Sequence, residues 1–518
     1  MIASSSPFLV YFLLILTTIF YLTKITTTFV RRRHLVRLHA CKPPPKLPTS
    51  DILGLNTVKH SYTSHQNHTY LQLSQRRFRD HGTTFAATLL PGGNPVINTI
   101  DPRNIQSILA RNFGDWELGS QRRSAFEPLL GKGIFCADGH AWSGSRKMLR
   151  PYFARDQIAD MELFERHFQA LLRCVPVSVD GISANTELSE LFFQFTLDVA
   201  TELFFGESCC SLQVGTKERK FEEVEFRDAF NRAQRTIANN VVVGFWAKFL
   251  GKRGQFRDDC RRVHAFVDGY VNNFIGKRAR LGPKKSESGD NSKTVEKSVL
   301  LEELCQQTSD RKQVRSELVN ILVAGRDTTA SLLSNFWFVL AREPRVWEKL
   351  KEEVSQLQGT EITLTNLKEL KYLRQCLKES LRLHPPVPIN TRQARVDTVI
   401  PVGGGDDGSS PIFVPAGTRV GYNVYAMHRR PDFFGPDAET FVPERWDELR
   451  PGWEFLPFNG GPRICLGQQL ALTEASYVTV RLLQEFDGVE ADGGVPWTEM
   501  LTLTCSPVDS TRVRFRKK

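Results

Sequence analysis

The chain has 518 residues, of which 41% are hydrophobic and 24% charged, an ordinary globular composition with ample material for a large core. Its net charge of +11 admits nucleic acid, an anionic membrane or an acidic protein as partner, but no nucleic-acid motif accompanies the charge, and part of it follows an apolar N-terminal segment. The ten cysteines show no C-x-x-C pair and no zinc spacing, which argues against a disulfide framework or a zinc module and is typical of reduced thiols facing the cytosol.

The first 23 residues contain no charged side chain, and residues 7–22 are strongly apolar. With its flanks, this segment reaches the roughly 20 residues that are needed to cross a bilayer. A cleaved signal peptide is the alternative, but the positive leading region and the A-x-A-like cleavage site that it requires are missing.

The residues that follow the apolar segment are basic: Lys24, Arg31, Arg32, Arg33 and Arg37. By the positive-inside rule this asymmetry places the rest of the chain in the cytosol. We therefore predict a single-pass anchor of the endoplasmic reticulum membrane over residues 1–30. A basic and proline-rich linker is expected over 31–50, and one globular domain over 51–518.

A short motif in the first half of the chain pairs an aromatic with a basic residue. Trp142 and Arg146 lie four residues apart, so on a helix they share a face, and the indole N–H and the guanidinium can donate to one acceptor. The alternative is a solvated helix face that carries one buried tryptophan. Further along, residues 282–297 are polar and lack periodicity, which predicts a surface loop.

Residues 310–343 are predicted to form one long helix of roughly 50 Å, with Thr308, Ser309 and Asp310 as candidate N-caps and Pro344 as its stop. In its middle, the hydroxyl of Thr328 can bond to the carbonyl of Ala324, which bends a helix and opens a groove. Small residues beside such a groove leave room for a small ligand, and Asp327 and Thr328 can relay protons to it. A plain packing kink is the alternative.

Glu379 and Arg382 lie three residues apart on a predicted helix that ends at His384, so the two can pair. Beyond this helix, short β-like runs appear at residues 398–400, 412–414 and 418–420, with a glycine-rich insert over 403–410. The sheet content is small. The sequence therefore predicts a mainly α fold with a small β component.

The run from Phe458 to Gly467 fits the pattern F-x-x-G-x-R-x-C-x-G, with Gly461, Arg463 and Cys465 at the specified positions. Glycines let backbone amides approach a sulfur closely, and a helix that begins after Gly467 would further stabilise a thiolate. A buried structural cysteine in a glycine turn is the alternative. The whole pattern resembles the cysteine loop of the cytochromes P-450, and the motifs before it occur in the order of that family.

This resemblance implies a cytochrome P-450 fold preceded by a single N-terminal transmembrane helix, with haem b bound through a Cys465 thiolate as the axial iron ligand. Asp327 and Thr328 would be the catalytic residues that activate oxygen. Arg445, in the family's second arginine motif, would complete a structural network with Glu379 and Arg382. The further residues expected to bind the cofactor are Trp142, Arg146, Arg392, Phe458 and Arg463.

Three stretches, 324–330, 453–469 and 472–478, resemble the fungal n-alkane and fatty-acid hydroxylase group in particular. The resemblance implies a monooxygenase that hydroxylates a long aliphatic chain with electrons from NADPH–cytochrome reductase, with cytochrome b5 as a further candidate donor. Substrate contacts are expected from four places: residues 113–126, 239–246, Val323 and 387–391. The alternatives are tailoring of a polyketide or terpenoid, a haem carrier without turnover, and a non-oxidative haem-thiolate isomerase.

Overall fold

The computed structural model describes residues 7–48, 54–88, 95–153, 160–213, 221–244, 253–281, 299–357, 359–508 and 511–517. The predicted surface loop over 282–297 lies outside these residues. So do residues 245 and 246 of one expected substrate-contact stretch.

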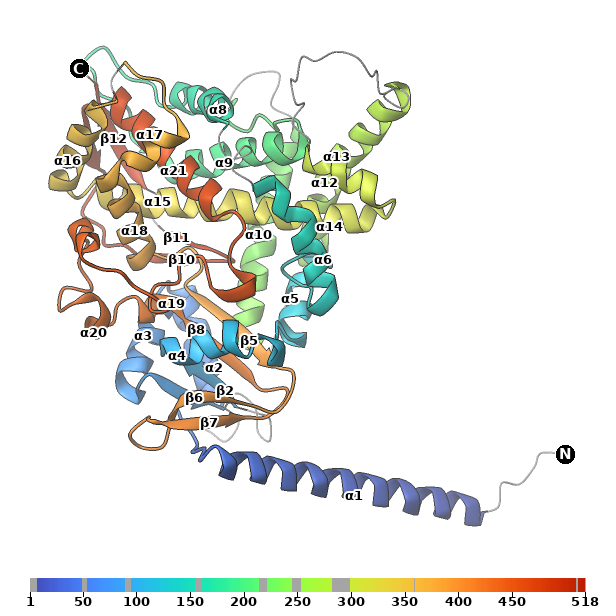
Figure 1. Ribbon diagram of the computed structural model, residues 1–518. Helices are drawn as coiled ribbons and strands as arrows, with labels where there is room; N and C mark the ends of the chain where they lie inside the picture. The colour runs from blue at the N-terminus through green and yellow to red at the C-terminus, as the bar shows by residue number, and fades with distance from the viewer. Residues whose placement is uncertain are drawn as a thin grey trace.

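Helix α1 (Pro7–Leu38) projects from the body of the molecule (Figure 1). In the described part of the chain, its stretch Tyr11–Leu38 alone is long and apolar enough to cross a membrane, and no residue of its apolar 18-residue window is buried in the body. The hydroxyls of Thr17, Thr18 and Thr23 donate to carbonyls four residues earlier, so these polar groups are satisfied within the helix. The helix continues without a break past residue 30, where the linker was expected to begin.

The strands of the described residues form four small sheets. The largest sheet has the order β1-β2-β8-β5-β3, in which β2 and β8 are parallel and the other pairs antiparallel. Its strands are β1 (Thr84–Ala87), β2 (Val96–Thr99), β3 (Trp116–Glu117), β5 (Ile389–Ala394) and β8 (Arg419–Asn423). The remaining sheets are β6 (Thr398–Gly404) with β7 (Ser410–Val414), β4 (Thr186–Glu187) and β9 (Gly488–Ala491) on either side of β12 (Arg512–Arg516), and β10 (Glu499–Leu501) with β11 (Cys505–Pro507).

The three β-like runs of the sequence are confirmed as β6, β7 and β8, and the glycine-rich insert forms the hairpin between the first two. Strand β5 was missed because its sequence, INTRQA, is polar and shows no clear alternation. It becomes a strand because β8 and β3 pair with its two edges.

Most of the body is helical, and its main hydrophobic core lies among the helices. The helices that build this body and flank the sheets are α2 (Leu55–Gln66), α3 (Tyr70–His81), α4 (Pro102–Gln106), α5 (Ser120–Leu130), α6 (Gly139–Leu149), α8 (Met161–Arg173), α9 (Leu188–Phe205), α10 (Phe221–Val243), α12 (Arg253–Leu281), α13 (Leu300–Gln307), α16 (Pro344–Ser355), α17 (Leu364–Glu369), α18 (Lys371–Leu383), α19 (Val424–Met427), α20 (Pro431–Phe434) and α21 (Gln468–Glu485). The predicted mainly α fold with a small β component is confirmed.

The predicted long helix crosses the body as α14 (Arg311–Leu322) and α15 (Thr328–Leu340), which lie in line in Figure 1. Asp310 caps it by accepting from the amides of Lys312 and Gln313 at 2.9 and 3.3 Å. Between the two parts, Val323–Asp327 form a π-helical turn, which the sequence pattern did not predict. The helix ends at Leu340, and Pro344 occupies the first turn of α16.

Candidate active site

The cysteine loop folds back on itself just before α21. The amide of Cys465 donates to the carbonyl of Phe458 at 3.0 Å, and the amide of Ile464 donates to that of Gly461 at 3.0 Å. Gly461 has φ +67°, and a Cβ there would lie 1.9 Å from the carbonyl oxygen of Leu109. A side chain at this position would therefore displace the loop, which explains the glycine of the motif.

Cys465 is the one exposed cysteine among the ten of the chain. Protein nevertheless surrounds the thiol closely enough that burial raises its pKa, against the opposing effects of the Gly467 amide and Arg146. The thiol is therefore both accessible and closely surrounded by protein. Arg146 donates to the carbonyl of Ile464 at 2.9 Å, so this side chain also fixes the residue before the cysteine.

The central helix opens on one face only. From Glu317 to Phe338 every residue is buried except Ala324, Gly325 and Thr328, which are half-buried. The hydroxyl of Thr328 donates to the carbonyl of Ala324 at 2.6 Å, which confirms the predicted back-bond. This accessible face consists of the small residues Ala324, Gly325 and Thr328 in the middle of the predicted helix.

Two aromatic rings connect this face with the cysteine loop. A Cβ on Gly467 would lie 3.3 Å from the Phe153 ring, and the centroids of Phe153 and Phe204 are 5.6 Å apart. The Phe204 ring lies 3.7 Å from where a Cβ of Gly325 would stand. The two motifs, some 140 residues apart in sequence, therefore share one wall of the site.

Asp327 forms a buried ion pair with its neighbour Arg326. Nη1 of Arg326 lies 2.7 Å from Oδ1 of Asp327 and donates to Oδ1 of Asn231 on α10 at 3.2 Å. The guanidinium also lies over the rings of Phe193 and Phe230, with distances of 5.1 and 5.4 Å to their centroids. Burial raises the pKa of Asp327, and Arg326 opposes that rise.

The two expected catalytic side chains therefore bond to different partners, Thr328 to its own helix and Asp327 to Arg326. The π-helical turn ends between these positions: Arg326 reaches Asn231 on α10, while Thr328 stays on the half-buried face of the helix. Arg326 was not among the predicted site residues, although its place beside Asp327 within the motif was a usable signal.

Three arginines converge from distant parts of the chain. Burial and the charge of Arg392 lower the pKa of Arg122 to about 10. The pKa of Arg463 is also lowered to about 10, by burial and by the charges of Arg392 and Arg122. Arg122 donates to Oδ1 of Asn390 at 3.1 Å, and Arg392 donates to the same atom at 3.2 Å. Mutual repulsion between buried cations is relieved by an anion, and the two propionates of haem fit this requirement.

Trp142 lies beside this cluster, since the guanidinium of Arg463 is 4.5 Å from the centroid of its ring. Arg463 also donates to the carbonyl of Ala137 at 2.9 Å and to Asp138 at 2.7 Å. The structure thus brings together Trp142, Arg392 and Arg463 of the predicted cofactor residues. It adds Arg122, for which the sequence offered no signal.

Glu379 is fully buried and is the centre of a hydrogen-bonded network. Its carboxylate accepts from Nε and Nη2 of Arg382 at 2.9 and 2.8 Å, from Nε of Arg445 at 2.8 Å and from the indole of Trp446 at 3.0 Å. The amide of Val442 completes the set at 2.9 Å. These contacts join α18 to the segment that precedes the cysteine loop.

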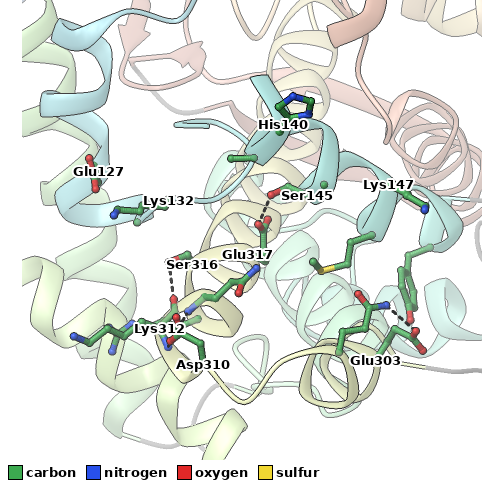
Figure 2. A pocket seen from close by; sticks show the side chains of 18 of the residues that line it. Glu127, Lys132, His140, Ser145, Lys147, Glu303, Asp310, Lys312, Ser316 and Glu317 are labelled. Atoms are coloured by element: carbon green, nitrogen blue, oxygen red, sulfur yellow. Dashed lines mark hydrogen bonds between the residues drawn. The ribbon is translucent and has the colours of Figure 1, made fainter. Parts of the chain in front are cut away.

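A separate cavity of about 1230 Å³ opens between α5, α6, α13 and α14 (Figure 2). Glu317 lies at its wall and accepts from the hydroxyl of Ser145 at 2.5 Å. Cys465 and Thr328 are not among its lining residues. This cavity therefore does not contain the reaction site.

Comparison with known proteins agrees with this geometry. The family model described as Cytochrome P450 matches residues 45–508. The cytochrome P450 monooxygenase himC of Aspergillus japonicus is 45% identical over 488 residues, which are 94% of this chain and 86% of that protein. Cytochrome P450 monooxygenase fsdH of Fusarium heterosporum is 39% identical over 96% of this chain and 87% of its own length. Cytochrome P450 52A13 of Debaryomyces hansenii is 44% identical over 82% of each chain.

Members of this family bind haem through a cysteine thiolate and generally take electrons from a reductase. The accessible thiol, the arginine cluster and the small-residue face of the central helix are the features that such a cofactor requires. This chain belongs to the cytochrome P450 family of haem-thiolate monooxygenases.

Proposed function

We propose that this monooxygenase hydroxylates a long aliphatic chain of the alkane or fatty-acid type. The observation that carries the proposal is the single accessible face of the central helix, formed by Ala324, Gly325 and Thr328. A face without bulky or charged groups accepts an unbranched apolar chain beside the reacting centre. The likeness of residues 324–330 and 453–469 to the n-alkane and fatty-acid hydroxylase group supports the same substrate class.

The proposed roles of the residues follow from their contacts. Cys465 gives the thiolate ligand, and Phe458 holds the loop through the hydrogen bond to the Cys465 amide. Arg392 and Arg463, together with Arg122 and Trp142, receive the propionates, while Arg146 fixes the cysteine loop through Ile464. Bound haem supplies the activation of O₂.

The proton-handling residues are Thr328 and Asp327. Thr328 holds its hydroxyl on the accessible face through the bond to Ala324 and is placed to position a water there. Asp327 exchanges protons with this face only after its carboxylate leaves Arg326, since the two now form an ion pair. Arg326 is therefore a positioning residue for Asp327.

Several apolar or half-buried groups fit the expected substrate walls. Phe126 is half-buried beneath the guanidinium of Arg122, 4.6 Å from its ring centroid, and Val387 and Ile389 are half-buried where β5 begins. Phe113 instead packs on Trp142, with centroids 5.5 Å apart, which supports a place beside the propionate cluster.

We further propose that the chain is a single-pass protein of the endoplasmic reticulum with its haem domain in the cytosol, where NADPH–cytochrome reductase donates electrons. The apolar helix α1 supports membrane anchoring, and the basic residues after its apolar part support the orientation. Cytochrome b5 is a second candidate donor. Residues 1–30 remain the proposed anchor, 31–50 the linker and 51–518 the haem domain.

The test is product formation by the full-length protein reconstituted with the reductase. Medium- and long-chain alkanes and fatty acids are offered beside a metabolite extract of the host, and products are identified by mass. We expect hydroxylated aliphatic chains that require both NADPH and O₂. Oxidation of a polyketide or terpenoid alone would replace the substrate assignment, and products formed without NADPH would indicate an isomerase. No product from any substrate would favour a haem carrier.

A further inference from the structure

Asp397, in the turn between β5 and β6, is a buried carboxylate held by the N-terminal helix. Its side chain is 2% exposed. Arg32 donates to both carboxylate oxygens through Nε at 3.1 Å and Nη2 at 3.0 Å, and Arg31 donates through Nη2 at 2.9 Å. The amide of Ala416 completes the set at 2.8 Å.

The charges of the two arginines are needed at this position. Burial by itself would raise the pKa of Asp397, but the hydrogen bonds from Arg32, Ala416 and Arg31 outweigh it and hold the pKa at about 2. The carboxylate is therefore ionised at any physiological pH. Undocking α1 would break the three charge-assisted hydrogen bonds from Arg31 and Arg32, so Asp397 favours the arrangement in which the end of α1 stays docked.

The segment after α1 is also fixed to the sheets rather than free. The amide of Lys42 donates to the carbonyl of Pro411 at 2.9 Å, and the amide of Gly405 donates to that of Pro43 at 3.0 Å. A Cβ on Gly404 would lie 2.3 Å from the carbonyl oxygen of Lys42, so the close approach requires glycine there. This stretch of the proline-rich linker therefore does not act as a flexible hinge.

The position of the ion pairs with Asp397 relative to a bilayer follows from the length of α1. From Leu22, at the end of the apolar run, to Arg31 are nine residues of continuous helix, which span roughly 14 Å. Since the headgroup region is about 5–8 Å deep on each side, the ion pairs lie just outside the bilayer. Arg33 and Arg37 lie one helical turn apart, are exposed, and make none of the contacts to Asp397.

We propose that Arg31 and Arg32 clamp the membrane helix to Asp397, so that anchor and haem domain tilt as one body on the membrane. In this arrangement the turns beside Asp397 and Ala416 face the lipid headgroups. Arg33 and Arg37 are left to bind anionic headgroups, so the basic cluster divides into a clamp pair and a lipid pair. The inference rests on the proposed membrane anchoring.

The test measures the tilt of the haem plane by polarised absorption, with full-length holoprotein in aligned phosphatidylcholine bilayers. Asp397→Asn and the double variant Arg31→Gln/Arg32→Gln should each change the mean tilt and broaden its distribution. Combining all three substitutions should add little, because each breaks the same clamp. Arg31→Lys/Arg32→Lys, which keeps the charges, should retain most of the wild-type order.

The matched control is Arg33→Gln/Arg37→Gln, which removes two other positive charges from the same helix. It should keep the wild-type tilt in phosphatidylcholine and lose only the response to added phosphatidylserine. The carbonyl-complex spectrum checks that the haem domain of every variant is folded. Wild-type tilt in both clamp variants, or an equal change in the control, would overturn the clamp. A wild-type protein that does not partition into membranes would instead refute the anchoring on which it rests.

Discussion

Replacing Glu379 by glutamine tests whether its buried network holds the haem pocket together. One carboxylate oxygen accepts from Nε of Arg382 and the indole of Trp446; the other accepts from Nη2 of Arg382, Nε of Arg445 and the amide of Val442. In Glu379→Gln, whichever oxygen becomes an NH₂ group faces at least two donors. Two lost charge-assisted bonds, with Arg382 left without its counter-charge, predict a loss of about 3–5 kcal/mol in the free energy of unfolding.

Glu444→Gln is the matched control, because Glu444 also pairs with two cations, Arg345 and Lys349, but its side chain is 30% exposed. We expect this variant to lose less than about 1 kcal/mol. Urea unfolding of the holoprotein, followed by the carbonyl-complex absorption and by circular dichroism, measures both. Equal destabilisation by the two substitutions, or a loss under about 1 kcal/mol in Glu379→Gln, would show that the network does not stabilise the pocket.

Cys465→Ser should abolish the carbonyl-complex absorption of a thiolate haem, and a spectrum that persists would remove Cys465 as the ligand. Thr328→Val keeps the shape of the side chain but not its hydroxyl, so haem binding should remain while product per NADPH falls and peroxide rises; unchanged coupling would contradict the relay. Burial raises the pKa of Glu499 to about 7, so the native state loses stability as the pH rises from about 4.5 to about 7. The free energy of unfolding of Glu499→Gln, compared with that of the wild type, should therefore increase by up to about 3 kcal/mol between about pH 5 and pH 8. A difference between the two proteins that does not change with pH would count against this. Asn67, in the single N-x-S/T sequon of the chain, is exposed and should stay unmodified in the cytosol, whereas a mass shift on endoglycosidase treatment would reverse the proposed topology.

Features that depend on neighbouring residues could be predicted from the sequence. The helix cap, predicted among Thr308, Ser309 and Asp310 and found at Asp310, connects residues within a few positions of one another. So do the bond from Thr328 to Ala324 and the tight loop before α21. Their geometry follows from local backbone conformation, which residue types and spacing largely determine. The pairing of Glu379 with Arg382 belongs to the same class, and the resemblance to the P450 family added Arg445.

Interactions that require the chain to close on itself were decided by the tertiary structure. Arg122, Arg392 and Arg463 come from α5, β5 and the cysteine loop, and no pattern marks the first of them. The π-helical turn lies against α9, where the hydroxyl of Thr196 donates to the carbonyl of Arg326 at 2.9 Å, and its Arg326 side chain reaches Asn231 on α10.

The basic residues after the apolar segment are the basis of the proposed orientation of the anchor, because charge asymmetry is a property of the sequence. That Arg31 and Arg32 among them bind protein was decided by the position of Asp397, 365 residues beyond Arg32. A sequence pattern reveals interactions between residues that are close along the chain. Clusters of like charges, and pairs between a buried charge and a distant partner, form only when folding brings the segments together.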